Sequence, residues 1–396
     1  MPRSSSRRHQ IKFRTSFSNT IYDVLVGRGW KETDSETEWD VHWAEREWVY
    51  EVFDTMHLEP HQRINHFRNG RELCRKDLLV KNLKRMKRNL QRDGQVEQAR
   101  AYDFMPLSFA LPREYAMFVE EFKRSGGIWI MKPIGSAQGR GIFLFTRLSE
   151  ISEWRTDPRH RGDKNNDDRA EPEAYIVQRY IDNPYVIGGK KFDIRLYVLV
   201  TSFSPLVAYL YRGGFARFSH TRYSAEPADV ANNFVHLTNV AIQKTAENYD
   251  ARSGGKKDLR SLKLLMASRH GMKAVDELFL AIERVIVNAS PSLSANTKED
   301  YALKCEMLND AMDLVDVEAK LNGDEESVGG FDLIYEGGVV QHDPENCEWS
   351  TRLGTAIFRR PPSSSSGSGA AAPPHGNAAA AATSDDERQQ HHQTTT

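Results

Sequence analysis

The chain has 396 residues, of which 39% are hydrophobic and 28% charged, and its 54 basic and 55 acidic residues leave a formal net charge of −1. These values exclude a wholly disordered chain and a uniformly basic nucleic-acid-binding protein. Because no apolar run reaches ~18 residues and the three cysteines form no CxxC pair, we expect no membrane span, no signal peptide and a reducing, cytosolic setting.

Charge is strongly segregated along the chain. Residues 1–14 carry five basic side chains and no acidic one, and the segment from Arg63 to Arg92 holds eleven basic residues against two acidic ones, a local net charge of +9. Residues 157–173 are polar and charged, which indicates a surface loop. The last stretch, 361–396, consists mainly of Ser, Gly, Ala, Pro, Gln and His, a composition typical of a disordered tail.

Hydrophobic periodicity predicts helices and short strands between these segments. The expected helices are 78–91, 114–124, 259–268, 272–287 and one that begins after Thr297, with Asp300 three residues beyond this N-cap. The expected strands are 128–132, 141–145, 174–180, 192–200 and 206–211. A short turn at 203–205 separates the last two and predicts an antiparallel hairpin. Helices that flank strand-rich blocks indicate an α+β fold.

A lysine and a glycine-bearing loop follow one predicted buried strand. Lys132 ends this strand, and Gln138-Gly139-Arg140-Gly141 lead into the next one. Glycines let backbone N–H groups approach an anion, and a nearby cation neutralises it, so the arrangement indicates a flap over nucleotide phosphates. Each feature also has an ordinary interpretation, because a lysine at a strand end often reaches solvent and hairpin turns use the same glycines.

A second group of polar side chains lies at the start of a long apolar strand. Lys191, Asp193 and Arg195 alternate and therefore share one face of it. Three charges there are costly unless they face a ligand or pair with each other, and we favour the ligand. The preceding strand ends in Gln178-Arg179-Tyr180-Ile181, whose backbone groups are placed to bind an adenine edge.

Several motifs taken together carry a resemblance to a known family. In chain order they read WIMKP, QGRGIF, QRYI, KFDIRLYVL, GFARFS, VHLTN and NASPS. The sequence resembles the tubulin tyrosine ligase-like family from about Phe13 to about Glu336, and most closely its polyglutamylase branch. The resemblance implies an ATP-grasp-like composite fold with mixed and antiparallel sheets flanked by helices. It also implies that ATP and Mg²⁺ support ligation of L-glutamate to glutamate side chains of tubulin C-terminal tails through an acyl-phosphate.

The resemblance also implies a domain plan. Residues 1–12 form a basic disordered leader and residues 13–125 an N-terminal and basic helical region. Residues 126–336 form the ATP-grasp-like core, shortened internally near 287–288. Residues 337–396 form a C-terminal extension that ends in the disordered tail.

The family's functional positions carry over to matching residues of this chain. Arg195 is placed to stabilise the acyl-phosphate, and Asn288 is a metal ligand. Arg217 and Lys256 hold the incoming amino acid. Their two positive charges favour glutamate over glycine as the amino acid that is added, because glutamate carries an additional carboxylate. The ATP-contact positions are Lys132, Gln138, Gly139, Gln178, Arg179, Tyr180, Ile181, Lys191, Phe192, Asp193, Thr238 and Asn239.

The basic segment fits an acidic partner. Tubulin tails are rich in glutamate, so a local positive charge would attract and hold them. The predicted tubulin-binding patch consists of Arg75, Lys76, Lys81, Lys84, Arg85, Lys87 and Arg88. A solvated basic helix face is the ordinary alternative, and nucleic acid ranks third because no aromatic residues interleave the charges. The resemblance further implies polyglutamylase complex subunits as partners, and a cytoplasmic, cytoskeletal location at cilia, flagella and basal bodies.

Two features depart from the family pattern. Ser136-Ala137 stand where the flap usually has Arg-Ser, and Arg140 where it has Lys. More importantly, the predicted helix 272–287 runs directly into the NASPS motif, so the strand pair that carries the two metal carboxylates has no counterpart. Two hypotheses follow: an internally shortened polyglutamylase, or a non-catalytic tubulin-binding or complex-forming subunit.

Overall fold

A computed structural model describes residues 10–136, 138–151, 174–247, 249, 255–283, 295 and 297–340. Most of the predicted leader, the loop at 157–173, the junction near 287–288, Asn288 and the predicted tail lie outside the described residues. By its internal contacts the chain divides into two compact units, of which unit 1 comprises 1–70, 195–215 and 258–396, and unit 2 comprises 71–194 and 216–257. Two long strands, β10 (Lys190–Phe203) and β11 (Leu206–Phe218), run from one unit into the other.

Unit 1 combines a small parallel sheet with helices and the outer parts of a larger sheet. The parallel sheet has the order β2-β1-β3-β4, and in the larger one β13 and β14 extend the pair β11-β10. Its remaining elements are β1 (Lys12–Thr15), α1 (Thr20–Gly27), β2 (Lys31–Glu32), β3 (Val41–Trp43), α2 (Arg46–Glu51), β4 (Arg63–Ile64), α10 (Leu259–His270), α11 (Met272–Glu283), α12 (Lys298–Leu314), β13 (Ser327–Val328) and β14 (Phe331–Glu336).

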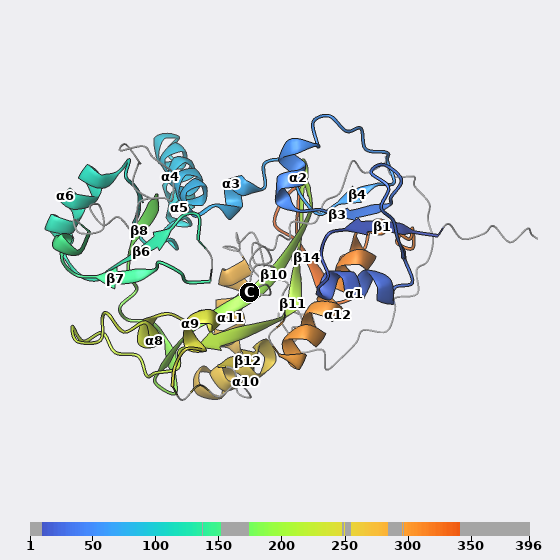
Figure 1. Cartoon of the computed structure of the whole chain (residues 1–396). Coiled ribbons are helices and arrows are strands. Elements are labelled where there is room, and N and C mark those ends of the chain that lie inside the picture. The colour runs from blue at the N-terminus through green and yellow to red at the C-terminus, as the bar shows by residue number, and fades with distance from the viewer. Residues whose placement is uncertain are drawn as a thin grey trace, which may run out of the picture. The chain divides into compact units, whose positions relative to one another are not determined.

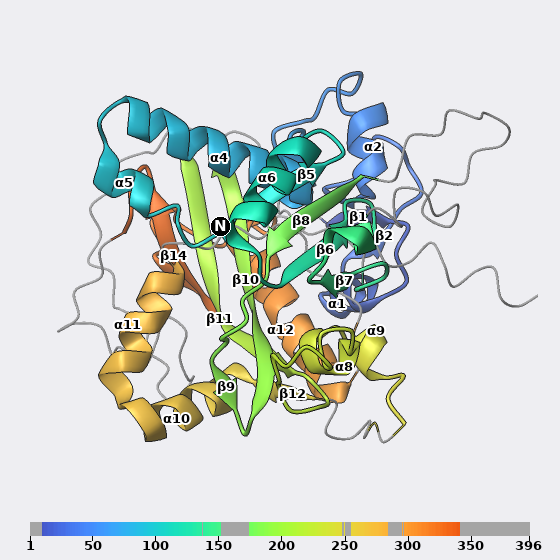
Figure 2. The same ribbon diagram turned by 90° about the vertical axis from the view of Figure 1, so that its left-hand side faces the viewer.

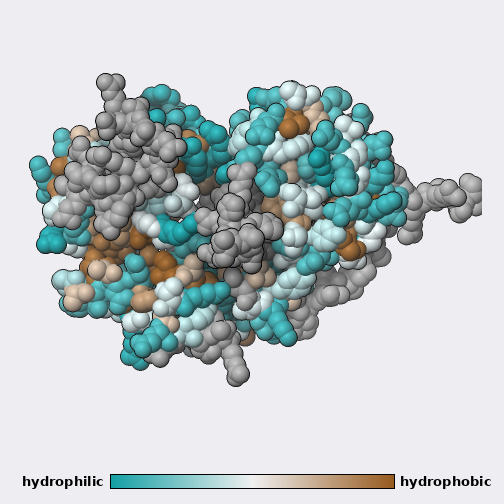
Figure 3. Space-filling view, in the orientation of Figure 1, coloured by the Kyte–Doolittle hydropathy of each residue, from teal (hydrophilic) through white to brown (hydrophobic). Residues whose placement is uncertain are grey.

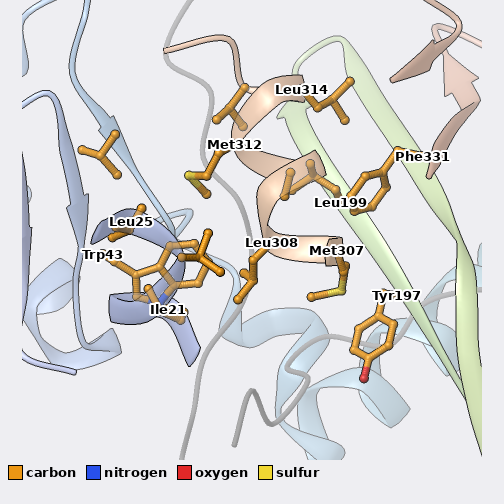
Figure 4. Packing of buried hydrophobic residues seen from close by; sticks show 14 of the residues in the cluster. Ile21, Leu25, Trp43, Tyr197, Leu199, Met307, Leu308, Met312, Leu314 and Phe331 are labelled. Atoms are coloured by element: carbon orange, nitrogen blue, oxygen red, sulfur yellow. The ribbon is translucent and has the colours of Figure 1, made fainter. Parts of the chain in front are cut away.

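The core of unit 1 lies between α1 and α12, which are neighbours in Figure 1. Asn19 caps α1 by accepting a hydrogen bond from the Ile21 N–H at 2.9 Å, and the helix buries a face at i, i+3 and i+4. Figure 4 shows Ile21 and Leu25 facing Leu308 and Met312 of α12. Each fully buried side chain of this kind contributes roughly 1.5–3 kcal/mol, so this packing determines the position of both helices.

Unit 2 contains an antiparallel sheet of order β5-β8-β6-β7. In Figure 2 the long helix α4 leads into α5. The elements are α3 (Arg71–Cys74), α4 (Lys76–Arg92), α5 (Val96–Arg100), β5 (Ser108–Leu111), α6 (Tyr115–Ser125), β6 (Trp129–Pro133), β7 (Phe143–Phe145), β8 (Tyr175–Arg179), β9 (Val186–Ile187), α8 (Asn233–His236), α9 (Val240–Gln243) and β12 (Lys256–Asp258), the last residue of which belongs to unit 1.

The two faces of this sheet bury different side chains. Trp129 and Met131 of β6 point into an aromatic core that α6 completes through Phe118. Ile130 points to the other face and joins a second apolar cluster with Leu144 of β7. Because strand side chains alternate, Lys132 shares the face of Ile130. Figure 3 shows hydrophobic side chains gathered at the surface between β7 and α8.

The α+β class and the predicted elements are confirmed. The predicted strands correspond to β6, β7, β8, β10 and β11, and the predicted helices to α4, α6, α10, α11 and α12. Thr297 caps α12, accepting a hydrogen bond from the Asp300 N–H at 3.2 Å, as its sequence position predicted. Helix α11 ends at Glu283, and the predicted continuation to 287 lies outside the described residues. Among the described helices, none is long and apolar enough to cross a membrane.

Candidate functional site

Three polar side chains line the second face of the unit 2 sheet. Lys132 donates from Nζ to Gln178 Oε1 at 2.7 Å, and Gln178 Nε2 donates to Ser108 Oγ at 2.8 Å. The register pairs Ser108 with Gln178, and Gln178 with Ile130, the residue two before Lys132. The alternation of strands β5, β8 and β6 therefore brings the three together. Lys132 and Gln178 were predicted as ATP contacts, whereas Ser108 was not, since nothing in its own sequence marks it.

Lys132 is held in a strongly electropositive position. Burial, together with the positive charges of Lys191 and Lys76, lowers its pKa to about 8. Its hydrogen-bond acceptor is a neutral amide, which does not offset the charge. A polyanion such as a nucleotide phosphate would relieve this repulsion and raise the pKa again. The side chains present therefore fit a phosphate group.

The connection between β6 and β7 forms a loop with left-handed backbone. Gln138 has φ +60°, Gly139 +86° and Gly141 +68°. A Cβ on Gly139 would lie 2.6 Å from Ile242 Cδ1 and 2.9 Å from Asn239 Cγ, so only glycine allows this approach. Two segments predicted as nucleotide contacts, the flap and the Thr238-Asn239 pair, are thus adjacent in the structure.

Lys76 belongs to this loop rather than to an outward-facing patch. Its Nζ donates to the carbonyl oxygens of Pro133 and Ser136, each at 3.0 Å. The amine thereby fixes the start of the flap and adds positive charge beside Lys132. The sequence placed Lys76 among the basic residues of the helix, because only the tertiary structure brings the first turn of α4 against the end of β6.

Lys191 and its neighbours form a second cationic group. Lys191 Nζ donates to the His236 carbonyl oxygen at 2.7 Å and lies 5.2 Å from the centre of the Tyr180 ring. Burial lowers the pKa of its amine. Tyr180 in turn contacts the His236 ring, with 3.0 Å between its hydroxyl oxygen and Nδ1. The predicted nucleotide contacts Tyr180 and Lys191 therefore meet here, beside His236 at the end of α8.

Asp193 and Arg217 form a bidentate ion pair. Arg217 donates from Nε and Nη2 to the two carboxylate oxygens of Asp193, at 2.9 and 2.6 Å. The neighbouring Phe192 stacks on Phe218, with ring centres 5.2 Å apart. The sequence left two interpretations for the charges of this strand, contact with a ligand or pairing with each other. Asp193 forms an ion pair, but its partner lies outside the strand. The pair fixes the guanidinium and leaves its Nη1 outside the pairing.

Of the other predicted site residues, Arg179 is directed away from this cluster. The Arg179 side chain turns to the Gly126 carbonyl and the Trp129 ring, on the opposite face of the sheet. The backbone N–H groups of Arg179 and Tyr180 already donate to Leu107 and Ile128. Ile181 is 57% exposed. Lys256 opens β12, which pairs with β11. Arg195 falls in unit 1.

The basic helix α4 uses part of its charge internally. Lys84 pairs with Glu114 at 3.0 Å and Lys87 with Asp103, while Arg75 pairs with Asp77 at 2.6 Å. Arg88 donates to the backbone of its own helix. Within the described part of the chain, Lys81 and Arg85 are the patch residues that make no ion pair or hydrogen bond of their side chains, so they are the cations most available to an acidic partner.

A magnesium site does not emerge from the described residues. Among them, no three His, Cys, Asp or Glu side chains gather in a way that would hold a metal ion. Asp193, two residues from Lys191, has both oxygens engaged by Arg217. Mg²⁺ prefers carboxylate oxygens, so these residues do not fit the ion.

Comparison with known proteins gives a consistent result. The model of the Tubulin-tyrosine ligase family matches residues 54–289. The chain is 42% identical to a probable tubulin polyglutamylase TTLL9 of Rattus norvegicus, covering 87% of this chain and 88% of the relative. It is 41% identical to the probable tubulin polyglutamylase ttll-9 of Caenorhabditis elegans, covering 83% and 85%. It is 34% identical to the probable alpha-tubulin polyglutamylase Ttll1 of Tetrahymena thermophila, covering 83% and 93%.

The alignment also bears on the length of the chain. With the rat protein it extends over 406 positions, more than the 396 residues of the whole chain, although it takes in only 87% of them. The relative therefore has residues with no counterpart here.

Proposed function

Since the chain belongs to the tubulin-tyrosine ligase family, we propose that it is an ATP-dependent tubulin polyglutamylase that joins L-glutamate to glutamate side chains of tubulin tails. Relatives that cover most of the chain carry the name of this activity, which favours the ligase over a non-catalytic binding subunit. Residues 126–336 would form its ATP-grasp-like core.

One observation carries the nucleotide part of the proposal. The amines of Lys191 and Lys76 lie close enough to Lys132 to lower its pKa, and neutral oxygens accept hydrogen bonds from all three lysines. Such a group of positive charges is costly without an anion and suits the phosphates of ATP. The apolar cluster of Ile130, Leu144 and Tyr180 on the same side of the sheet suits a purine base.

The reaction requires the chain to bind and orient the reactants and to stabilise the charge that develops. ATP supplies the phosphoryl group that activates a tail carboxylate, which is otherwise a poor acyl donor. The amine of free glutamate then attacks the activated carbonyl carbon, and phosphate leaves. Arg217, fixed by Asp193, presents its remaining N–H groups to a glutamate carboxylate, with Lys256 as the second cation. Arg195 would neutralise the phosphate charge that develops during attack.

The described residues do not fit Mg²⁺. We propose that the chain is shortened near residues 287–288, where the family's metal carboxylates would lie. Two observations support this: the rat relative has residues without counterpart in the chain, and the family match ends at residue 289. Transcript sequence across Val287–Asn288 tests it, since an additional exon is expected there.

The partners follow from charge. The acidic tail of tubulin suits α4, where Lys81 and Arg85 remain available and Arg88 adds to the field. The proposed location is the cytoskeleton, and more specifically cilia, flagella and basal bodies. Subunits of a polyglutamylase complex are a further proposed class of partner.

Incorporation of labelled glutamate tests the function directly. Purified chain is incubated with tubulin, ATP, Mg²⁺ and labelled L-glutamate, and the tails are analysed by mass spectrometry. We expect added glutamate residues that depend on ATP and that disappear with Lys132→Met. Tubulin binding without any incorporation would contradict the ligase and support the non-catalytic subunit.

A further inference from the structure

His236 occupies a fully buried position at the end of α8, with 0% of its surface exposed. Both ring nitrogens have partners: Nδ1 lies 3.0 Å from the Tyr180 hydroxyl, and Nε2 lies 3.0 Å from the Asp229 carbonyl oxygen. The ring also meets Tyr180 and Tyr223 edge to face, at centre distances of 5.4 and 5.7 Å. The imidazole is therefore fixed on every side.

These partners determine the tautomer. A carbonyl oxygen only accepts, so Nε2 must carry the hydrogen and donate to Asp229. Nδ1 is then the acceptor, and Tyr180 donates its hydroxyl hydrogen to it. Burial lowers the pKa of the imidazole, and the charge of Lys191 lowers it further against the opposing influence of Asp229, which favours this neutral form.

The backbone of the same residue holds a lysine of the nucleotide site. The His236 carbonyl accepts from Lys191 Nζ at 2.7 Å, and this amine lies over the Tyr180 ring, whose hydroxyl meets the imidazole. His236 therefore acts on the Lys191 amine in two ways. Its carbonyl oxygen accepts the hydrogen bond of the amine, and its ring contacts Tyr180, over whose ring the amine lies. It also immediately precedes Leu237-Thr238-Asn239, which leads to the flap glycine.

We propose that His236 is a positioning residue of the nucleotide site, which places the Lys191 amine for a phosphate group through its carbonyl and through Tyr180. It makes no contact with nucleotide itself. This inference depends on one part of the proposed function, namely that the lysine cluster binds ATP. The Asp229–His236–Tyr180–Lys191 series links the loop before α8, the end of β8 and the start of β10 into one polar unit.

The test measures nucleotide binding rather than turnover. His236→Gln retains a side-chain N–H for the Asp229 carbonyl and removes the acceptor for Tyr180. Tyr180→Phe removes the same hydrogen bond from the other partner and keeps the ring beneath Lys191. We expect each variant to raise the Kd for ADP, measured by calorimetry on the full chain, by about fivefold to twentyfold. In turnover, the KM for ATP should rise while the KM for glutamate stays within twofold.

His66 offers a matched control. It is also buried, at 6% exposure, and its Nε2 lies 2.9 Å from the Ala44 carbonyl oxygen, but it belongs to unit 1. His66→Gln should lower the melting temperature about as much as His236→Gln and leave the Kd for ADP unchanged. Equal loss of affinity in both histidine variants would mean that a general loss of stability is responsible and would overturn the inference.

A double-mutant cycle tests the connection to Lys191. Lys191→Met should weaken ADP binding by itself, and adding His236→Gln should then change the Kd by less than twofold, because the amine to be positioned is gone. The full fivefold to twentyfold loss in the Lys191→Met background would overturn the inference. So would wild-type affinity in His236→Gln. Absence of ADP binding in the wild-type chain would instead overturn the nucleotide site of the proposed function, and this inference with it.

Discussion

The buried ion pairs of unit 1 and the lysine cluster of unit 2 treat buried cations in opposite ways. In unit 1, Lys304 is 3% exposed and pairs with Asp300 at 3.3 Å, Arg28 pairs with Asp313 at 2.6 Å, and Arg212 pairs with Asp332. In the lysine cluster of unit 2, Lys132 and Lys191 bond a neutral amide oxygen and a backbone carbonyl. A carboxylate cancels the charge it pairs with, whereas a neutral oxygen leaves it. The first arrangement serves structure, and the second keeps positive charge for an anionic ligand.

The largest effect on stability is expected from substitution of Lys304. Lys304→Met would remove the ammonium group that pairs with Asp300, whose side chain is 2% exposed, in unit 1. Loss of one member of a buried ion pair typically costs ~3–5 kcal/mol. We expect urea unfolding to show a loss of this size and calorimetry to show unchanged ADP affinity in the remaining folded protein. A loss below about 1 kcal/mol would mean that the pair contributes little to unit 1.

The histidines of unit 1 extend the comparison to pH. Burial lowers the pKa of both His42 and His66 to about 4, whereas the pKa of histidine in an unfolded chain is ~6.5. The unfolded state therefore binds more protons, so stability is full above pH ~6.5 and is lost as the pH falls toward 4, by up to roughly 3 kcal/mol per histidine.

Substitution at His42 isolates this effect from the protonation of carboxylates. His42→Phe keeps a ring between Trp39 and Trp48 and removes the titrating group. Urea unfolding at pH 7 and pH 4.5 should show a smaller loss on acidification in this variant than in the wild type. An identical loss in both proteins would contradict the prediction.

Removing the Lys132 side chain should have opposite effects on stability and on nucleotide binding. Its folded pKa of about 8 lies below the ~10.4 of an unfolded lysine. The charge therefore destabilises the folded chain at pH 7, and the penalty disappears as the pH rises from 8 past 10. Lys132→Met should leave the ligand-free chain as stable as wild type or more stable by up to roughly 2 kcal/mol, while the Kd for ADP rises at least tenfold. Lys81→Met on the exposed face of α4 is the control and should change neither quantity.

The smallest expected effect is the uptake of a fraction of a proton when nucleotide binds. If phosphate relieves the repulsion among the three lysines, nucleotide binding raises the pKa of Lys132 and the complex takes up protons near pH 8. Calorimetry in two buffers of different ionisation enthalpy should detect about half a proton per ADP at pH 8 and none at pH 6. Proton release at pH 8 would show that Lys132 does not face the phosphates.

The sequence pattern singled out part of the lysine cluster, and it missed the rest for physical reasons. Lys132, Gln178 and Lys191 were found because they stand at strand ends in an alternating pattern, and β6, β8 and β10 formed as that pattern required. Lys76 was predicted only as part of the basic patch, and its hydrogen bonds to the loop after β6 were not foreseen, since a lysine on a basic helix carries no local signal of the loop it will contact. The role of His236 was not predicted either, because a single buried histidine more often serves packing alone.

The sequence by itself determined the elements, the α+β class and the family, because hydrophobic periodicity, turn residues and ordered motifs are local properties of the chain. Only the tertiary structure decided which charges are cancelled and which are kept. Asp193 meets Arg217 across 24 residues, Lys76 meets Pro133 across 57, and Lys191 meets the His236 carbonyl across 45. Electrostatic interaction depends on distance and burial. Strand pairing and helix packing set both, and no local pattern records them.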